Sequence, residues 1–140
     1  MGKRVENVRK KLRFGNGVIV EPEKLSEGLS LWWNEDVKVQ MVASIKKLID
    51  TFILLPRSNK GCMVFWVHGA SIYENRKVVW ETIKRKARYI KKAWMCIGDF
   101  NDILLYSEKQ GERMEENRKV ESFQDMVNTC QLNDVMYKGK

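Results

Sequence analysis

The stretch that decides the fold reads Trp94-Met95-Cys96-Ile97-Gly98-Asp99-Phe100-Asn101. Its apolar half is typical of a short buried strand, and Gly98 lets the backbone approach neighbouring groups closely. We therefore expect Asp99 and Asn101 at a strand's carboxyl end and on one face of it, because residues two apart in extended backbone point the same way. A carboxylate beside an amide suits phosphate-ester hydrolysis, in which water is oriented and deprotonated while donors hold the phosphoryl oxygens. The structural alternative is that both side chains only cap the turn after the strand.

The residues before this stretch predict one short helix and then a run of strands. The helix covers residues 3–13, where Val5, Val8 and Leu12 recur at helical spacing. The turn formers Asn34-Glu35-Asp36 predict an antiparallel hairpin between the strands on either side of them. The predicted strands span residues 14–21, 29–33, 37–45, 48–55 and 62–67.

Two longer helices complete the pattern. The first has an apolar stripe and begins with Ser71 and Glu74 at the spacing of a capping box. The second follows residues 98–101 and could be capped by Asn117. The stripe residues are Val79, Trp80, Ile83, Ala87 and Ile90 in the first helix, and Val120, Phe123, Val127 and Cys130 in the second.

The motif and its surroundings resemble a known family. Gly98-Asp99-Phe100-Asn101 is similar to the Gly-Asp-Phe-Asn signature of the endonuclease/exonuclease/phosphatase superfamily, which has the DNase I-like fold. The flanking residues 94–111, with residues 28–34, 37–39, 49–50 and 76–80, occur in the order typical of the endonuclease domain of plant non-LTR (LINE-type) retrotransposons. The resemblance implies an α/β sandwich of two mostly antiparallel sheets with outer helices. We expect residues 1–140 to form a single, partial domain of this kind.

The resemblance also implies roles for three residues. Asp99 would align or deprotonate the attacking water, and Asn101 would hydrogen-bond the phosphate or help to position the nucleophile. His68, the only histidine, lies where members of the superfamily carry a His or Tyr that contacts the scissile phosphate. An imidazole can donate a hydrogen bond to a phosphoryl oxygen near neutral pH, although a lone histidine is more often structural.

Other parts of the family's site have no counterpart among the 140 residues. The metal-binding Glu, typically within Gln-Glu-Thr-Lys, would precede the first helix, and an Asp-His pair would close the domain. Family members use Mg²⁺, and without that Glu we expect this chain to hold the ion weakly; the ligands that it would use here are unknown. We therefore expect a truncated nuclease domain that is inactive by itself. A phosphatase of small molecules shares the superfamily, but nothing here resembles a lipid or inositol pocket.

The charge balance favours a polyanionic partner. Lys and Arg number 26 against 18 acids, a formal net charge of +8. Basic residues concentrate along the first long helix and just after it, which is either a DNA-contacting face or a solvated surface. The alternative function is accordingly a non-catalytic, basic nucleic-acid-binding remnant. The candidate contact residues are Lys84, Arg85, Arg88, Lys91 and Lys92.

Composition limits the remaining classes. No apolar run is long enough to span a bilayer, and three scattered cysteines with one histidine lack the spacing of a zinc site. We expect a soluble intracellular protein without membrane contact, nuclear if the retroelement ancestry holds. Because outer strands of the sandwich would be missing, we also expect self-association through exposed sheet edges.

Overall fold

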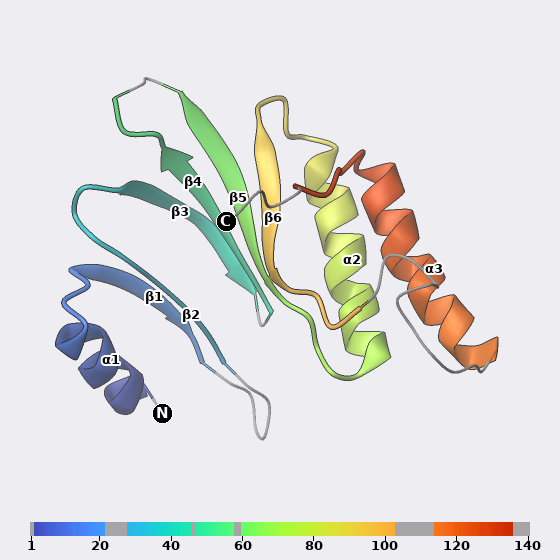
Figure 1. Cartoon of the computed structure of the whole chain (residues 1–140), viewed down its shortest axis with the longest axis horizontal. Helices are drawn as coiled ribbons and strands as arrows, with labels where there is room; N and C mark the ends of the chain where they lie inside the picture. Colours follow the sequence, from blue (N-terminus) through green and yellow to red (C-terminus); the bar gives the residue numbers. More distant parts are fainter. Residues whose placement is uncertain (1, 22–27, 46, 58–59, 103–113, 136–140) are drawn as a thin grey trace, which may run out of the picture. The chain divides into compact units, whose positions relative to one another are not determined.

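The computed structural model describes residues 2–21, 28–45, 47–57, 60–102 and 114–135. Within these residues the chain is a mixed α/β protein with three helices and two sheets, mostly antiparallel (Figure 1). This confirms the α/β class predicted from the sequence. In chain order, the elements are α1 (Gly2–Lys11), β1 (Asn16–Val20), β2 (Leu29–Trp33), β3 (Lys38–Ile45), β4 (Leu48–Leu54), β5 (Gly61–His68), α2 (Tyr73–Ala87), β6 (Trp94–Asp99) and α3 (Met114–Thr129).

The chain divides into two compact units. The sheet unit comprises Met1–His68 and Lys91–Asp99, and the helical unit comprises Gly69–Ile90 and Phe100–Lys140. Helix α1 and all six strands belong to the sheet unit, whereas α2 and α3 belong to the helical unit. The chain leaves the sheet unit directly after β5 and again directly after β6.

The larger sheet has the strand order β3-β4-β5-β6. Strands β3, β4 and β5 pair antiparallel, as predicted, and β6 pairs with β5 in parallel. A parallel neighbour needs a crossover connection, and here that connection contains α2. Leu48, Ile49 and Thr51 of β4 and Phe65 of β5 have no accessible surface, so the core of this sheet lies along its two central strands.

The predicted hairpin between β2 and β3 is wrong. Strand β2 pairs with β1, from Asn16 opposite Trp33 to Val20 opposite Leu29, whereas β3 pairs with β4 in the other sheet. The turn itself forms, since the Val37 N–H donates to the Asn34 carbonyl. Turn-forming residues thus predicted the change of direction correctly, but they carry no information on which strand edge the chain then joins.

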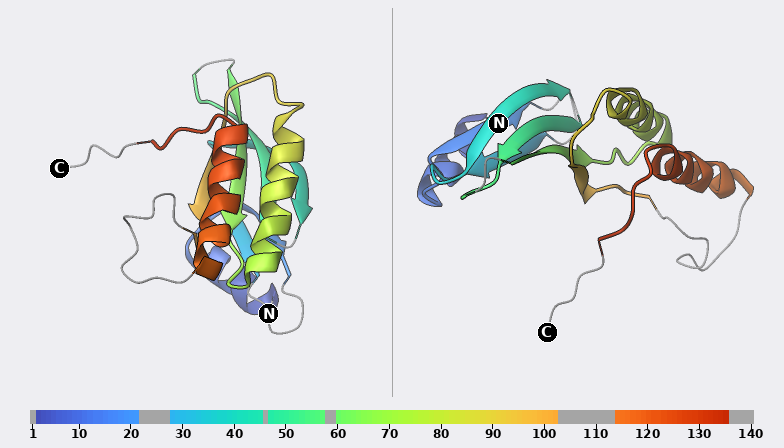
Figure 2. Two further views of the ribbon diagram at one scale, coloured as in Figure 1. Left: turned by 90° about the vertical axis from the view of Figure 1, so that its right-hand side faces the viewer. Right: turned by 90° about the horizontal axis from the view of Figure 1, so that it is seen from above.

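The helical unit has its own apolar core between α2 and α3. The two helices run side by side in the same direction (Figures 1 and 2). Phe123 of α3 lies 5.2 Å from Trp80 of α2 and 5.5 Å from Phe100, measured between ring centroids. Met126, one residue before the predicted Val127, is the fully buried residue of the next turn of α3.

Both predicted helix starts differ from those in the structure. The N-cap of α2 is Ile72, with no capping bond from its side chain, so the capping box from Ser71 to Glu74 does not form. The turn before α2 is held by Arg76 instead, whose Nη1 donates to the carbonyls of Ala70 (2.7 Å) and Ser71 (2.9 Å). Helix α3 begins at Met114, so Asn117 lies within the helix and is not its N-cap.

Candidate functional site

Two of the three predicted catalytic residues end neighbouring strands. His68 is the last residue of β5 and Asp99 the last of β6, and the two are directly paired in the parallel register. The carboxyl ends of parallel strands meet at one edge of a sheet, and paired residues present their side chains to the same face. The His68 backbone N–H also donates to the Lys47 carbonyl at 3.0 Å, which extends the ladder to the end of β5. The sheet therefore places an imidazole and a carboxylate side by side.

The surface beside this pair is apolar. Trp66 and Ile97 are the register pair two residues earlier, so they lie on the same face as His68 and Asp99. The Trp66 indole donates to the Thr51 hydroxyl at 2.8 Å, which fixes the ring on the sheet. Ile97 is 46% exposed and Asp99 is exposed, whereas His68 is half-buried. The carboxylate is therefore open to solvent next to a rigid apolar surface.

Gly98 makes the close pairing of these strand ends possible. Its φ is +145°, in the region that side chains disfavour, and a Cβ added here would overlap the carbonyl oxygen of Val67. The prediction that Gly98 permits a close backbone approach is confirmed. A larger residue would push the end of β6, and Asp99 with it, away from β5.

Asn101 occupies a different position from the one predicted. Strand β6 ends at Asp99, and Asn101 has left-handed backbone with φ 50°, so the alternation that would put the two side chains on one strand face does not continue. Its side-chain amide instead donates to the Gly69 carbonyl at 2.5 Å. Gly69 also has no room for a Cβ, which would overlap the Phe100 carbonyl. Asn101 thus joins the segment that follows β5 to the segment that follows β6.

A buried ion pair that the sequence did not reveal supports the same two segments. Arg76 of α2 and Asp102 expose only 9% and 4% of their side chains, with 3.4 Å between Nε and Oδ2. This distance exceeds that of a strong charge-assisted hydrogen bond, so the pair is an ionic contact supported by the bonds from Arg76 to the carbonyls before α2. The only sequence signal was an aspartate directly after Asn101. Nothing in the residues around Arg76 indicates that its side chain is buried.

The five predicted nucleic-acid contacts are not alike. Lys84 and Arg85 lie on α2, and Arg88 is its C-cap residue, all in the helical unit, whereas Lys91 and Lys92 belong to the sheet unit. Lys92 Nζ lies 5.3 Å from the centroid of the Phe52 ring, a cation–π distance. Arg85, Arg88 and Lys91 are exposed.

Lys84 is engaged by two carboxylates. Its Nζ lies 2.6 Å from Asp125 Oδ2 of α3 and 2.7 Å from Glu81 Oε1. The hydrogen bond to Asp125, followed by that to Glu81, raises the pKa of Lys84 above its ordinary value, and the same bond lowers the pKa of Asp125. Lys84 therefore connects α2 to α3, and its ammonium group is paired with two carboxylates instead of being exposed for contact with a phosphate.

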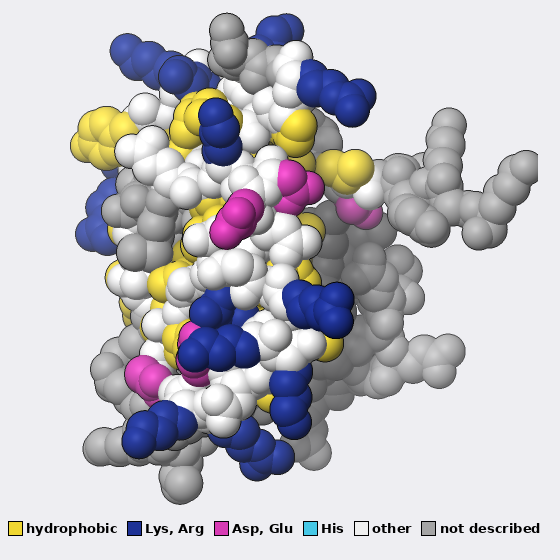
Figure 3. All heavy atoms as spheres, turned by 90° about the vertical axis from the view of Figure 1, so that its left-hand side faces the viewer, with side chains coloured by type: hydrophobic (Ala, Val, Ile, Leu, Met, Phe, Trp, Pro, Cys, Tyr) yellow, Lys and Arg dark blue, Asp and Glu magenta, His cyan; other side chains and the backbone are white. Residues whose placement is uncertain are grey.

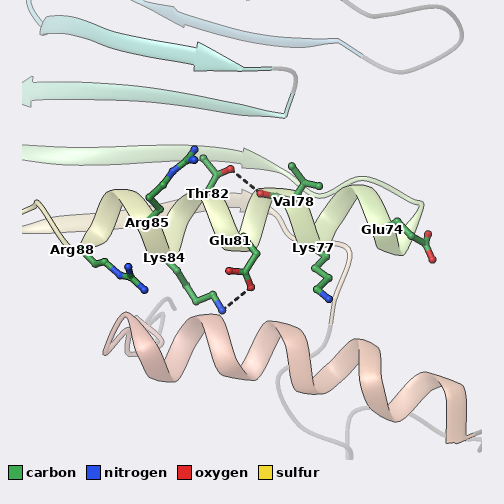
Figure 4. Close-up of a pocket in the computed structure, with 8 residues that line it drawn as sticks. All are labelled: Glu74, Lys77, Val78, Glu81, Thr82, Lys84, Arg85 and Arg88. Carbon is green, nitrogen blue, oxygen red and sulfur yellow. Dashed lines mark hydrogen bonds and ion pairs between the residues drawn. The ribbon is translucent and has the colours of Figure 1, made fainter.

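The surface of α2 around Lys84 is mixed in charge. A hollow along the helix is lined by Glu74, Lys77, Val78, Glu81, Thr82, Lys84, Arg85 and Arg88 (Figure 4). Carboxylates alternate with the cations in this set, and Asp125 adds another against Lys84. The positive potential of this face is accordingly weaker than its count of Lys and Arg suggests.

The described residues do not form a ready metal centre. Across these parts of the chain, no three His, Cys, Asp or Glu side chains lie close enough together to hold an ion. The nearest register partner of Asp99 is His68, whereas Mg²⁺ prefers oxygen ligands. The donor set at this edge therefore does not fit Mg²⁺ by itself. Among the described residues, no helix is both long and apolar enough to cross a membrane.

Comparison with known proteins adds no assignment to this geometry. No protein-family model matches the chain, and no curated protein matches its sequence.

Proposed function

We propose that this chain is a fragment of a retrotransposon-derived endonuclease domain of the DNase I-like superfamily, ancestrally a Mg²⁺-dependent phosphodiesterase acting on DNA. The observation that carries the proposal is the register pair of His68 and Asp99 at the ends of parallel strands. Asp99 belongs to the stretch Gly98-Asp99-Phe100-Asn101, so the motif that resembles the family signature lies beside the histidine that resembles its phosphate contact. Two mostly antiparallel sheets are compatible with the sandwich that the proposal includes.

The chemistry of this edge follows from the two side chains. The exposed Asp99 carboxylate accepts a hydrogen bond from a water molecule and can take its proton as the water attacks phosphorus. The imidazole of His68, on the same face, donates to a phosphoryl oxygen. Asn101 acts here by fixing the turn after β6 through Gly69. Groups that act as a unit lose most of their effect when partners are missing, so we expect the chain alone to be a very poor nuclease.

A plasmid-nicking assay with Mg²⁺ tests this assignment. We expect the 140-residue chain to nick no faster than Asp99→Ala, and a chain extended by the family's metal-binding Glu and terminal Asp-His segments to nick measurably. In the extended protein, Asp99→Ala should lower the rate by about 100-fold or more, in line with the loss of a general base.

The matched control is Asp36→Ala, which removes an exposed carboxylate from the turn before β3. Its nicking rate should equal that of the unmutated extended protein. Cleavage that persists in Asp99→Ala would overturn the site assignment. Genomic DNA that encodes Gln-Glu-Thr-Lys upstream, and an Asp-His ending with a reverse transcriptase downstream, would support the retroelement origin and with it a nuclear site of action.

The second candidate is a nucleic-acid-binding protein without catalysis. The formal net charge of +8 favours it, because a polyanion relieves the repulsion among the cations. Binding of this kind weakens steeply as salt rises, and salt-independent binding would contradict it.

A further inference from the structure

Helix α1 carries a positive face on which only Lys10 has a carboxylate within ion-pair distance, Glu6 Oε1 at 3.9 Å from its Nζ. An α-helix turns by about 100° per residue, so four of the five cations of α1, Lys3, Arg4, Lys10 and Lys11, fall within one sector of about 120°. All four side chains are exposed, and α1 contains no buried residue. Figure 3 shows this side of the molecule, on which Lys and Arg side chains occupy the upper and the lower part and Asp and Glu side chains lie among them. We call these four residues the α1 basic face.

The single carboxylate of α1 lies beside this face and is held mainly by Arg9; its contact with the exposed Lys10, at 3.9 Å, is long and contributes little. Glu6 accepts hydrogen bonds from Arg9 at Nε (2.9 Å) and Nη2 (2.6 Å), and the hydrogen bond from Arg9 lowers the Glu6 pKa. Arg9 also donates to the Phe14 carbonyl (2.5 Å), and a Cβ on Gly17 of β1 would lie 2.9 Å from its Cδ. This side of α1 is therefore bound to the β1–β2 hairpin, which fixes the direction of the α1 basic face.

The contrast with α2 singles out α1 as the stronger anion site. The α2 hollow contains Glu74 and Glu81 among its cations, and Lys84 is held by Glu81 and Asp125. On the α1 basic face the contacts with carboxylates are weaker: Glu6 lies 3.9 Å from Lys10 and is already bound to Arg9, and Glu21 lies next to Gly2 at the start of the helix. Like charges one or two turns apart on a helix repel one another, and a polyanion would remove this repulsion.

We propose that the α1 basic face is where this protein binds the phosphate backbone of duplex DNA; the inference rests on the nucleic-acid partner of the proposed function but not on catalysis at Asp99. Seven residues of helix span about 10 Å, so the pairs Lys3–Lys10 and Arg4–Lys11 cover about that length along the axis. A duplex presents one negative charge per about 1.7 Å of its axis, so a face of this length meets several phosphates.

An anionic membrane is the less suitable partner. Helices that lie in a membrane interface bury a large apolar face with aromatic or leucine side chains. The apolar side of α1 offers only Val5 and Val8, with Leu12 directly after the helix, and Val8 and Leu12 are 42% and 58% exposed. The apolar area that α1 offers for insertion into lipid is therefore small.

The test is a fluorescence-anisotropy titration of a labelled duplex, in EDTA, over a series of salt concentrations. The variant Lys3→Gln/Arg4→Gln/Lys10→Gln/Lys11→Gln should bind at least about tenfold more weakly near 0.1 M salt, and the slope of log K against log[salt] should fall in magnitude by about 3 to 4. The control removes the same charge elsewhere, with Lys77→Gln/Arg85→Gln/Arg88→Gln/Lys91→Gln, and should lose less than about threefold. Circular dichroism checks that both variants fold.

The outcomes separate the alternatives. Equal losses in both variants, a larger loss in the control, or no DNA binding by the wild type overturns the proposal. A wild type that binds phosphatidylserine vesicles through α1, while the α1 variant keeps its DNA affinity, also overturns it. Charge-preserving Lys3→Arg/Lys10→Arg/Lys11→Arg should bind like the wild type, and a loss of binding in this folded variant would contradict a phosphate-contact role. Because EDTA excludes metal-dependent cleavage, failure of the nuclease assignment leaves this result unaffected.

Discussion

At the scale of single residues, Gly98 is the position at which the candidate site tolerates least change. The backbone at φ +145° and the Val67 carbonyl both exclude a side chain. We expect Gly98→Ala to lower the free energy of unfolding by at least about 2 kcal/mol, since strained backbone and overlap add. Urea denaturation followed by circular dichroism measures this.

Gly15→Ala is the control for Gly98→Ala. Gly15 is exposed, and a Cβ there would meet only the flexible side chain of Glu35, at 3.3 Å. Its effect should remain within about 0.5 kcal/mol, as for ordinary surface substitutions. If Gly98→Ala and the wild type unfold at the same urea concentration, the ends of β5 and β6 can separate without loss of stability.

At the scale of elements, the start of α2 depends on Arg76. This side chain donates to the carbonyls of Ala70 and Ser71 and contacts Asp102, so it holds the turn before α2 in place. Removing one partner of a buried pair leaves the other charge buried and uncompensated. We expect Asp102→Asn to destabilise the protein by about 2 kcal/mol. This is less than the loss of one partner from an isolated buried ion pair, because Arg76 still donates hydrogen bonds to the carbonyls of Ala70 and Ser71.

A double-mutant cycle isolates this interaction. Arg76→Met with Asp102→Asn should cost less than the sum of the single changes, by about 1 kcal/mol. The exposed neighbour Lys77→Met should change the free energy of unfolding by less than about 0.5 kcal/mol. Strict additivity of Arg76→Met and Asp102→Asn would show that the ionic contact contributes nothing.

The same elements show what local sequence patterns can predict. Helical periodicity identified the core of α3 through Val120 and Phe123, because packing on one face requires that spacing. Strand segments were recognised from apolar runs, but the pairing of β2 with β1 was missed because strand partners are chosen by contacts that a local turn does not encode. The burial of Arg76 was not predicted for a related reason: its partner Asp102 is brought close only by the fold.

At the scale of the whole molecule, the candidate site was predictable in composition but only partly in arrangement. His68 and Asp99 were selected from the motif and the resemblance, and their adjacency follows from the parallel pairing of β5 and β6. The role of Asn101 could not be predicted, because it depends on a left-handed residue and on the Gly69 carbonyl. Among the basic residues, charge count alone favours α2, but Lys84 of α2 is held by two carboxylates at 2.6 and 2.7 Å, whereas the α1 basic face has only the 3.9 Å contact of Lys10 with Glu6.

The outer position of β6 has a consequence for assembly. Within the described residues, β3 and β6 are the outer strands of the larger sheet, and β6 exposes 44% of Met95 and 46% of Ile97 on one face. Edge strands offer backbone donors and acceptors to a second copy, and exposed apolar side chains favour that contact. We expect the protein to associate with itself as its concentration rises, measured by light scattering after gel filtration.

Ile97→Lys should shift the protein towards the monomer, because an edge lysine opposes strand addition. Val78→Lys adds the same charge at an exposed position of α2 and should leave association unchanged, so equal effects of the two substitutions would assign the shift to net charge and exclude the β6 edge.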